Sequence, residues 1–175
     1  MNINKGNRNL ATGAIIAALY VALTYAQEML LPGSASAAIQ FRVSEALTVL
    51  ALFTPSAIPG LTVGCAVSNL VFMGALPLDV VLGAFASFLA LLCMYRLRFV
   101  TFKGIPVPAL LMPAIFNGII IGLEIEIFFI EGPFNFASFL VQGGCVALGE
   151  FGVCFTLGIL TYKMIKNKKI EKYIK

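Results

Sequence analysis

Residues 40–50 read Gln-Phe-Arg-Val-Ser-Glu-Ala-Leu-Thr-Val-Leu, a short polar stretch that leads directly into an apolar run. Arg42 and Glu45 are three positions apart, so a helix that begins here places both on one face. Ser44 is suited to cap such a helix, with Glu45 in its positively polarised first turn. Capping leaves Gln40 and Arg42 unexplained. We therefore favour a binding site here over a plain helix start.

The chain around this stretch has the composition of a membrane protein. It has 175 residues, of which 60% are hydrophobic and only 11% are charged. A soluble domain of this length cannot bury so much apolar surface in one core. Each spanning helix needs about 20 apolar residues, so about six crossings fit and no length remains for a soluble domain. We predict an all-α membrane protein, with residues 1–175 forming a single integral membrane domain.

Several kinds of chemistry are excluded by residue content. The chain has no histidine, which removes the commonest general base and metal ligand. It has no GxxxxGK[ST] stretch to hold nucleotide phosphates, so energy from ATP must come from another chain. The four cysteines lie in apolar segments without a CxxC pair, and we interpret them as packing residues. We expect no metal and no cofactor, and an intramembrane enzyme is the least favoured class.

Six apolar segments are expected to be helices, with residues 54–60, which contain two prolines, as a turn between the second and third. In chain order they are Asn9–Leu31, Glu45–Phe53, Leu61–Met73, Leu76–Met94, Ile105–Phe129 and Phe136–Tyr162. The apolar run from Leu10 to Ala26 is longer than the core of a secretory signal. We therefore expect the first helix to be retained.

The distribution of basic residues predicts the orientation. Lys5 and Arg8 place the amino terminus in the cytoplasm. A second cytoplasmic loop is indicated by Arg96, Arg98 and Lys103. The basic tail after the last segment then makes both termini cytoplasmic and residues 54–60 a cytoplasmic turn. Of the 12 Lys and Arg residues, only Arg42 falls on the outer side. The net charge of +4 is explained by this topology and by anionic lipid, without nucleic acid.

Small residues at helical spacing predict close helix contacts. The first helix carries Ala14, Ala18 and Ala22 in steps of four. GxxxG pairs occur at residues 60–64 and 118–122. Small residues at this spacing let helix backbones approach closely, so we interpret the glycine pairs as packing sites.

The last two predicted helices carry polar residues that membrane solubility does not require. Asn117 lies near the middle of the fifth, with Glu124 seven residues later on the same face, and Glu150 lies in the middle of the sixth, eight residues after Gln142. An ionised side chain at the centre of a bilayer costs about 3 kcal/mol, so such acids are expected to face a cavity or a partner. Asn117 and Glu150 should meet at one depth.

Four other polar residues are weaker candidates. Asn69, in an apolar helix, fits an interhelical hydrogen bond and a binding site equally well. Asp79 follows Pro77 at a helix start, where capping is the better interpretation. Glu126 and Glu131 approach the outer surface, where we expect them to be solvated.

The favoured acids and Arg42 predict a cavity that opens to the outside, with Arg42 and Glu45 at its rim and Glu150 at its floor. Such a cavity suits a small polar solute. A carboxylate accepts two parallel hydrogen bonds from a guanine-type edge, or pairs with a primary amine. Residue spacing leaves these two uses open.

Two stretches, Gln40–Leu50 and Val146-Ala147-Leu148-Gly149-Glu150, together with six helices in 175 residues, resemble the QueT family. These proteins are substrate-binding S components of energy-coupling factor (ECF) transporters, assigned to queuosine-precursor uptake. The resemblance implies high-affinity capture outside the cell, and docking on a membrane scaffold subunit and two ATPase subunits. An AxxxA pattern meets the scaffold in this group, and the match here is Ala14 and Ala18, with Ala18 to Ala22 as the alternative. It also implies a bacterial plasma membrane location, toppling in the membrane, and a lid at residues 32–39.

The ligand that the resemblance implies is queuine or its precursor 7-aminomethyl-7-deazaguanine. As hypotheses, Glu150 and Asn117 bind the base edge, and Glu124 holds an amine. Arg42, Glu45 and Gln40 would close the outer side. The full expected binding set is Gln40, Arg42, Glu45, Asn69, Asn117, Glu124, Gln142 and Glu150.

Two alternatives remain open at this point. The first is an S component for another vitamin, thiamine or a flavin. The second is a self-sufficient carrier of small polar solutes in which Glu150 or Glu124 couples protons. The chain shows no inverted repeat, which argues against the carrier.

Overall fold

The computed structural model describes residues 5–34, 41–72 and 77–166. It is built from helices, and the described residues contain no β-strand, only an isolated bridge between Phe102 and Ile105. The helices group into six segments. They are α1 (Lys5–Leu30), η1 (Val43–Leu52), α2 (Ala57–Phe72), α3 (Pro77–Leu97), then α4 (Val107–Leu110) with α5 (Met112–Glu124) and η2 (Ile125–Phe129), and finally α6 (Phe136–Val153) with η3 (Cys154–Gly158) and α7 (Ile159–Lys166).

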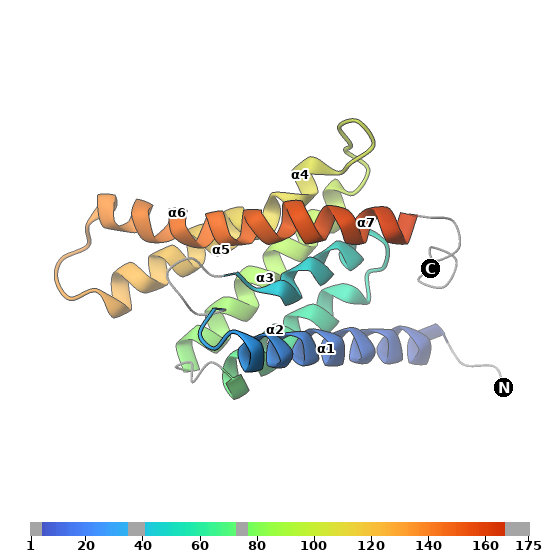
Figure 1. Ribbon diagram of the computed structural model, residues 1–175, viewed down its shortest axis with the longest axis horizontal. Coiled ribbons are helices and arrows are strands. Elements are labelled where there is room, and N and C mark those ends of the chain that lie inside the picture. Colours follow the sequence, from blue (N-terminus) through green and yellow to red (C-terminus); the bar gives the residue numbers. More distant parts are fainter. Residues whose placement is uncertain (1–4, 35–40, 73–76, 167–175) are drawn as a thin grey trace.

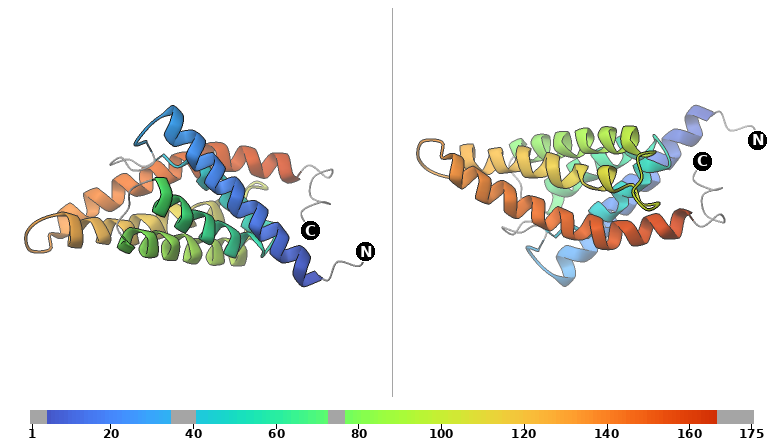
Figure 2. Two further views of the ribbon diagram at one scale, coloured as in Figure 1. Left: turned by 90° about the horizontal axis from the view of Figure 1, so that it is seen from below. Right: turned by 90° about the horizontal axis from the view of Figure 1, so that it is seen from above.

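The six segments run alternately in opposite directions, so that the start of α1 and the end of α7 lie at the same end of the bundle (Figure 1). Four of them are long and apolar enough to cross a membrane, while η1 and α2 are shorter. Helix α1 crosses the rest of the bundle obliquely (Figure 2). The predicted six helical segments are thus confirmed, and their orientation in the membrane stays a prediction.

The turn at the proline-containing stretch is shorter than expected. Helix α2 begins at Ala57 rather than Leu61, so residues 57–60 are helical and the prediction of a turn through residue 60 is wrong. Pro59 lies in the first turn of α2. A backbone N–H there would have no partner within the helix, so the lack of an N–H in proline costs little.

The fifth segment is interrupted at Leu111, where α4 gives way to α5. Pro113 follows in the first turn of α5 and cannot donate a hydrogen bond to the preceding turn. The segment therefore consists of two helices where the sequence predicts one.

The segment η1 is a 3₁₀ helix of ten residues. Such a helix has three residues per turn, so side chains at i and i+3 eclipse. Glu45, Thr48 and Ala51 therefore share one face, and each is at most 2% exposed. The three-residue spacing between Arg42 and Glu45 thus continues along η1 through Thr48 and Ala51.

Glycines hold two helix pairs together, as the GxxxG spacing predicts. A Cβ added to Gly60 of α2 would lie 2.5 Å from the carbonyl oxygen of Gly13 in α1. A Cβ on Gly143 of α6 would lie 2.5 Å from the carbonyl oxygen of Gly118 in α5. Any side chain at these positions would force the helices apart, so the packing interpretation is confirmed.

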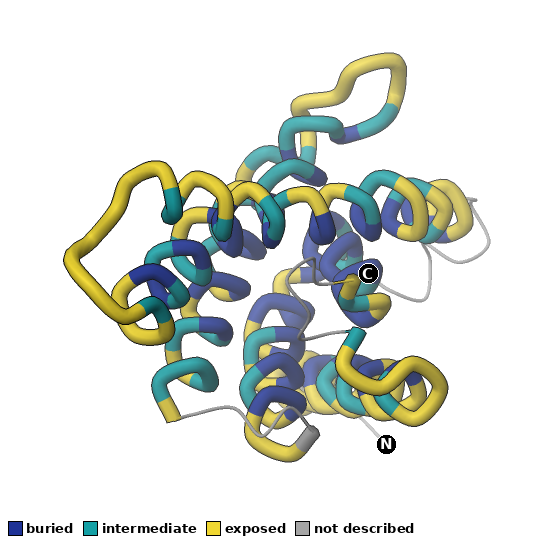
Figure 3. Tube along the Cα trace, turned by 60° about the vertical axis from the view of Figure 1, so that its left-hand side comes forward, coloured by how far each residue is buried: buried dark blue, intermediate teal, exposed yellow. Residues whose placement is uncertain are grey.

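Buried residues line the sides of the helices that face one another, while the outward sides are exposed (Figure 3). The apolar core occupies one end of the bundle, where the end of η1, the start of α2, the end of α3 and α7 meet around Leu52, Leu61, Met94 and Tyr162. Buried polar side chains concentrate toward the other end, in the second half of α1, the start of η1, the end of α2 and α5. The candidate site is therefore sought at the end of the bundle where the buried polar side chains gather.

Candidate functional site

The start of η1 is attached to α1 by side chains that point into the bundle. The Tyr20 hydroxyl donates a hydrogen bond to Glu45 Oε1 at 2.5 Å, and the Thr24 hydroxyl donates to Ser44 Oγ at 2.9 Å. The residue at the N-cap position is Arg42, and no side chain caps the helix. The expectation that Ser44 caps this helix is therefore wrong, because its buried hydroxyl is used as a partner for Thr24.

Gln27 fixes the backbone on both sides of Arg42. Its amide nitrogen donates to the carbonyl oxygen of Phe41 and to Ser34 Oγ, and its amide oxygen accepts from the N–H of Val43 at 2.8 Å. The side chain is 6% exposed. One buried amide thus holds the chain where it enters η1 and sets the direction in which Arg42 leaves the backbone.

Arg42 reaches from this point toward α2. Its Nη1 lies 4.0 Å from Cys65 Sγ, which also receives the Asn69 amide at 3.9 Å and the Ser87 hydroxyl at 3.4 Å. Three donors from three elements therefore converge on one buried sulfur. Cys65 belongs to the apolar core, as a packing residue should, but it also links that core to the polar side chains.

Glu150 of α6 and Asn117 of α5 meet as their positions predict. Asn117 Nδ2 donates to Glu150 Oε1 at 3.1 Å, and both residues are at least nine-tenths buried. Glu150 Oε2 is buried and accepts no hydrogen bond from the described part of the chain. A carboxylate oxygen in this state is suited to receive a donor from a bound molecule.

Arg42 is attracted electrostatically to both Glu45 and Glu150, while these two carboxylates are close enough to repel each other. The structure therefore brings one cation and two acids together from η1 and α6. We call Tyr20, Arg42, Glu45, Cys65, Asn117 and Glu150 the central cluster. Its groups can bind a polar molecule that offers hydrogen-bond donors to one end and acceptors to the other.

A second group lies beside the central cluster. Glu124 of α5 is 3% exposed and lies near enough to Asp79, in the first turn of α3, for the two carboxyl groups to interact electrostatically. Asn69 Nδ2 reaches the carbonyl oxygen of Asp79 at 3.4 Å. Interpreting Asp79 as a cap of its own helix does not reveal the contact with Asn69, because that contact joins α2 to α3.

The remaining predicted residues are placed as follows. Gln142 is half-buried on α6, two turns before Glu150. Gln40 and most of the expected lid at residues 32–39 lie outside the described residues. Ala14 and Ala18 are exposed on α1.

Glu126 contradicts the expectation of a solvated side chain, whereas Glu131 is exposed as expected. Glu126 is 3% exposed, and its Oε1 accepts a hydrogen bond from the backbone N–H of Asn135 at 2.9 Å. Asn135 in turn caps α6 through its side chain. The connection between η2 and α6 folds back over Glu126, which hydropathy alone does not reveal.

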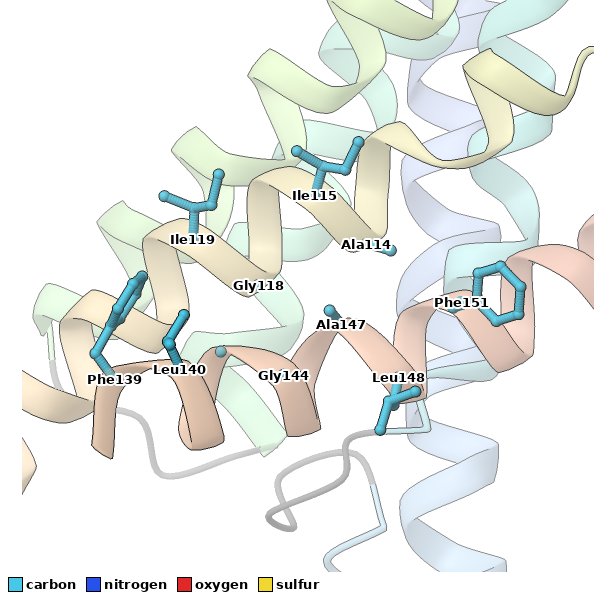
Figure 4. A pocket seen from close by; sticks show the side chains of 11 residues that line it. Ala114, Ile115, Gly118, Ile119, Phe139, Leu140, Gly144, Ala147, Leu148 and Phe151 are labelled. Atoms are coloured by element: carbon cyan, nitrogen blue, oxygen red, sulfur yellow. The ribbon is translucent and has the colours of Figure 1, made fainter. Parts of the chain in front are cut away.

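A hollow on the surface of the described part of the molecule lies elsewhere. It has a volume of about 580 Å³ and is lined by α5 and α6, with Ile115, Ile119, Leu140 and Leu148 around it (Figure 4). These four side chains are exposed and apolar, as expected of a surface that faces lipid. None of the polar residues described above lines it, so we place the candidate site at the central cluster.

Two supporting residues, Tyr20 and Gln27, were missed in the sequence. A signal for them exists, because Ile16, Tyr20, Thr24 and Gln27 follow one another at intervals of four, four and three residues, and all four are buried. This stripe lies on the side of α1 opposite to the exposed alanines. Within the described residues, no three Asp, Glu or Cys side chains are grouped as a metal site requires.

Comparisons with known proteins agree on one family. The family model described as "QueT transporter" matches residues 10–167. A protein of Lactococcus lactis subsp. cremoris (strain MG1363), named "Queuosine precursor transporter QueT", is 35% identical over 176 residues, which cover 94% of this chain and 96% of the relative. No solved structure matches the chain.

Proposed function

Because the chain belongs to the QueT transporter family, we propose that it is the substrate-binding S component of an ECF importer for a queuosine precursor. It captures queuine or 7-aminomethyl-7-deazaguanine outside the cell and delivers the molecule inward on an energising module. The observation that carries the proposal is the buried Glu150 carboxylate, whose Oε2 accepts no hydrogen bond from the described residues while Asn117 occupies Oε1.

The edge of a guanine-type base can supply the hydrogen-bond donors that the Glu150 carboxylate lacks. A guanine-type edge presents a ring N–H and an exocyclic amine side by side, and a carboxylate accepts two such parallel donors. Glu150 accepts from this edge and Asn117 orients it. The O6 carbonyl oxygen beside this edge is an acceptor to which the Arg42 guanidinium can donate.

Glu45 and Tyr20 keep Arg42 in place at the outer side of the site. Glu45 attracts the guanidinium and is itself fixed by the Tyr20 hydroxyl. We also propose contributions from Gln40, two residues before Arg42 in the sequence, and from Gln142, two turns before Glu150 on α6. A half-buried cation attracted by two acids is already positioned, so it costs little additional reorganisation when a polar ligand binds.

The docking face for the scaffold subunit is the exposed side of α1. Ala14, Ala18 and Ala22 are all exposed, while Ile16 and Tyr20 of the same helix are buried. Small exposed residues in steps of four allow another membrane helix to approach closely. The face therefore suits a membrane-embedded partner, and two ATPase subunits complete the importer in the bacterial plasma membrane.

Uptake experiments separate this proposal from a self-sufficient carrier. An S component takes up the 7-deazaguanine compound only when the scaffold and ATPase subunits are present with ATP. A carrier takes it up alone in liposomes under a proton gradient. Proton-driven uptake by the purified chain would contradict the proposal.

An Ala18→Leu variant tests the docking face separately. It should bind ligand like the wild type but lose uptake with the complete module, because the larger side chain keeps the scaffold helix away. Equal uptake by the variant and the wild type would remove Ala18 from the interface.

A further inference from the structure

Two acidic side chains, Glu124 of α5 and Asp79 of α3, lie near each other beside the central cluster. Glu124 is 3% exposed and interacts electrostatically with Asp79. We call Glu124 and Asp79 the acid pair, and a cation bound beside them would be attracted by both.

Two further acceptors at this place lack donors. Glu124 Oε1 and Asn69 Oδ1 are both buried, and neither accepts a hydrogen bond from the described residues. Asn69 is held at the acid pair by the contact of its Nδ2 with the Asp79 carbonyl oxygen at 3.4 Å. Gly83 leaves room for it, because a Cβ there would lie 2.6 Å from Asn69 Nδ2.

An alkylammonium group matches this set of acceptors. It carries three N–H donors and no acceptor, and it is cationic. The Glu124 carboxylate, the Asp79 carboxyl group and Asn69 Oδ1 offer three acceptors and negative charge. A neutral hydroxyl or nitrile would leave most of these acceptors unfilled, at a cost of roughly 1–3 kcal/mol for each buried group.

The acid pair is continuous with the central cluster. Asn69 also contacts Cys65, and Arg42 contacts the same sulfur. Along α5, Glu124 lies seven residues beyond Asn117, which corresponds to about 10 Å. A flat base bound at Asn117 and Glu150 can therefore direct a substituent on its far side toward Glu124.

We infer that Asn69, Asp79 and Glu124 form an ammonium-binding subsite, which receives the protonated amine of the substrate and so selects amine-bearing 7-deazaguanines over the bare base. This inference rests on the proposed function and adds to it the group by which substrates are distinguished. When it binds, the ammonium donates hydrogen bonds to the carboxylates of Glu124 and Asp79.

The test compares two ligands that differ only in the amine. The affinities of the purified full chain for 7-aminomethyl-7-deazaguanine and for 7-deazaguanine are measured by titration calorimetry. The wild type should bind the aminomethyl compound at least about tenfold more tightly. Equal affinities would overturn the inference while leaving the proposed function intact. Binding of neither compound by folded protein would contradict the proposed function, and the inference would fall with it.

Variants locate the preference. Glu124→Gln should remove it, because the aminomethyl compound loses more affinity than 7-deazaguanine does. Glu131→Gln makes the same change at an exposed glutamate and should preserve the preference. Asp79→Asn, in a half-buried position, provides a second variant should Glu124→Gln fail to fold. An equal loss for both ligands in the folded Glu124→Gln or Asp79→Asn variant would overturn the subsite.

Discussion

The Tyr20 hydroxyl on α1 donates a hydrogen bond to Glu45 Oε1 on η1 at 2.5 Å, which connects the helix that carries Ala14 and Ala18 to the stretch that carries Arg42. Helix α1 thus has two functional sides. Its exposed side offers small residues, and its buried side supports the candidate site. A displacement of α1 caused by a partner would act directly on Glu45.

Replacing Tyr20 with phenylalanine tests this connection. Tyr20→Phe removes the donor and leaves Glu45 Oε1 buried without it, which should lower stability by about 1–3 kcal/mol. Ligand affinity should fall as well, because Glu45 no longer holds Arg42 in one position. Thermal unfolding in detergent and ligand titration measure both effects. Tyr25→Phe on the exposed side of α1 is the matched control, and an equal change in the two variants would contradict the assignment.

Gln27 is predicted to be a positioning residue. Gln27→Leu loses the hydrogen bonds to Phe41 and Val43, so Arg42 should become less fixed and ligand affinity should fall about tenfold. Gln27→Glu keeps the acceptor for the Val43 N–H but loses the donor, and should give an intermediate affinity. A merely structural residue would instead lower stability and leave the affinity of the remaining folded protein unchanged.

The contact between α5 and α6 can be tested at adjacent glycines. Gly143→Ala places a Cβ 2.5 Å from the Gly118 carbonyl oxygen and should destabilise the protein by about 1–3 kcal/mol. Gly144→Ala is the control, because a Cβ there meets nothing within 4 Å. It should be neutral or slightly stabilising, since alanine favours the helix. Equal unfolding temperatures for the two variants would contradict the observed packing.

Glu150→Gln tests the proposed floor of the site. Glutamine has nearly the shape of glutamate but only one acceptor oxygen and no charge, so it cannot accept two parallel donors. We expect affinity for 7-deazaguanine ligands to fall by at least about tenfold. The same variant should fold, because its amide can still pair with Asn117. Unchanged affinity in the folded variant would remove Glu150 from the site.

Much of the fold follows from hydropathy, because each long apolar segment must form a helix in lipid. The pairing of Asn117 with Glu150 was also predictable, since both lie at the middle of their segments. The acid pair was not, because it depends on α3 lying beside α5. The burial of Glu126 depends on how the following loop returns over it, which residue spacing does not encode.

Ligand capture by this chain alone is the property on which the proposed function depends most directly. Titration calorimetry of the purified protein with queuine and 7-aminomethyl-7-deazaguanine, with thiamine and riboflavin as comparison ligands, measures it. We predict tight binding of at least one 7-deazaguanine without any partner subunit, and no binding of the two vitamins. Folded protein that binds neither 7-deazaguanine, or that binds a vitamin instead, would contradict the proposed function.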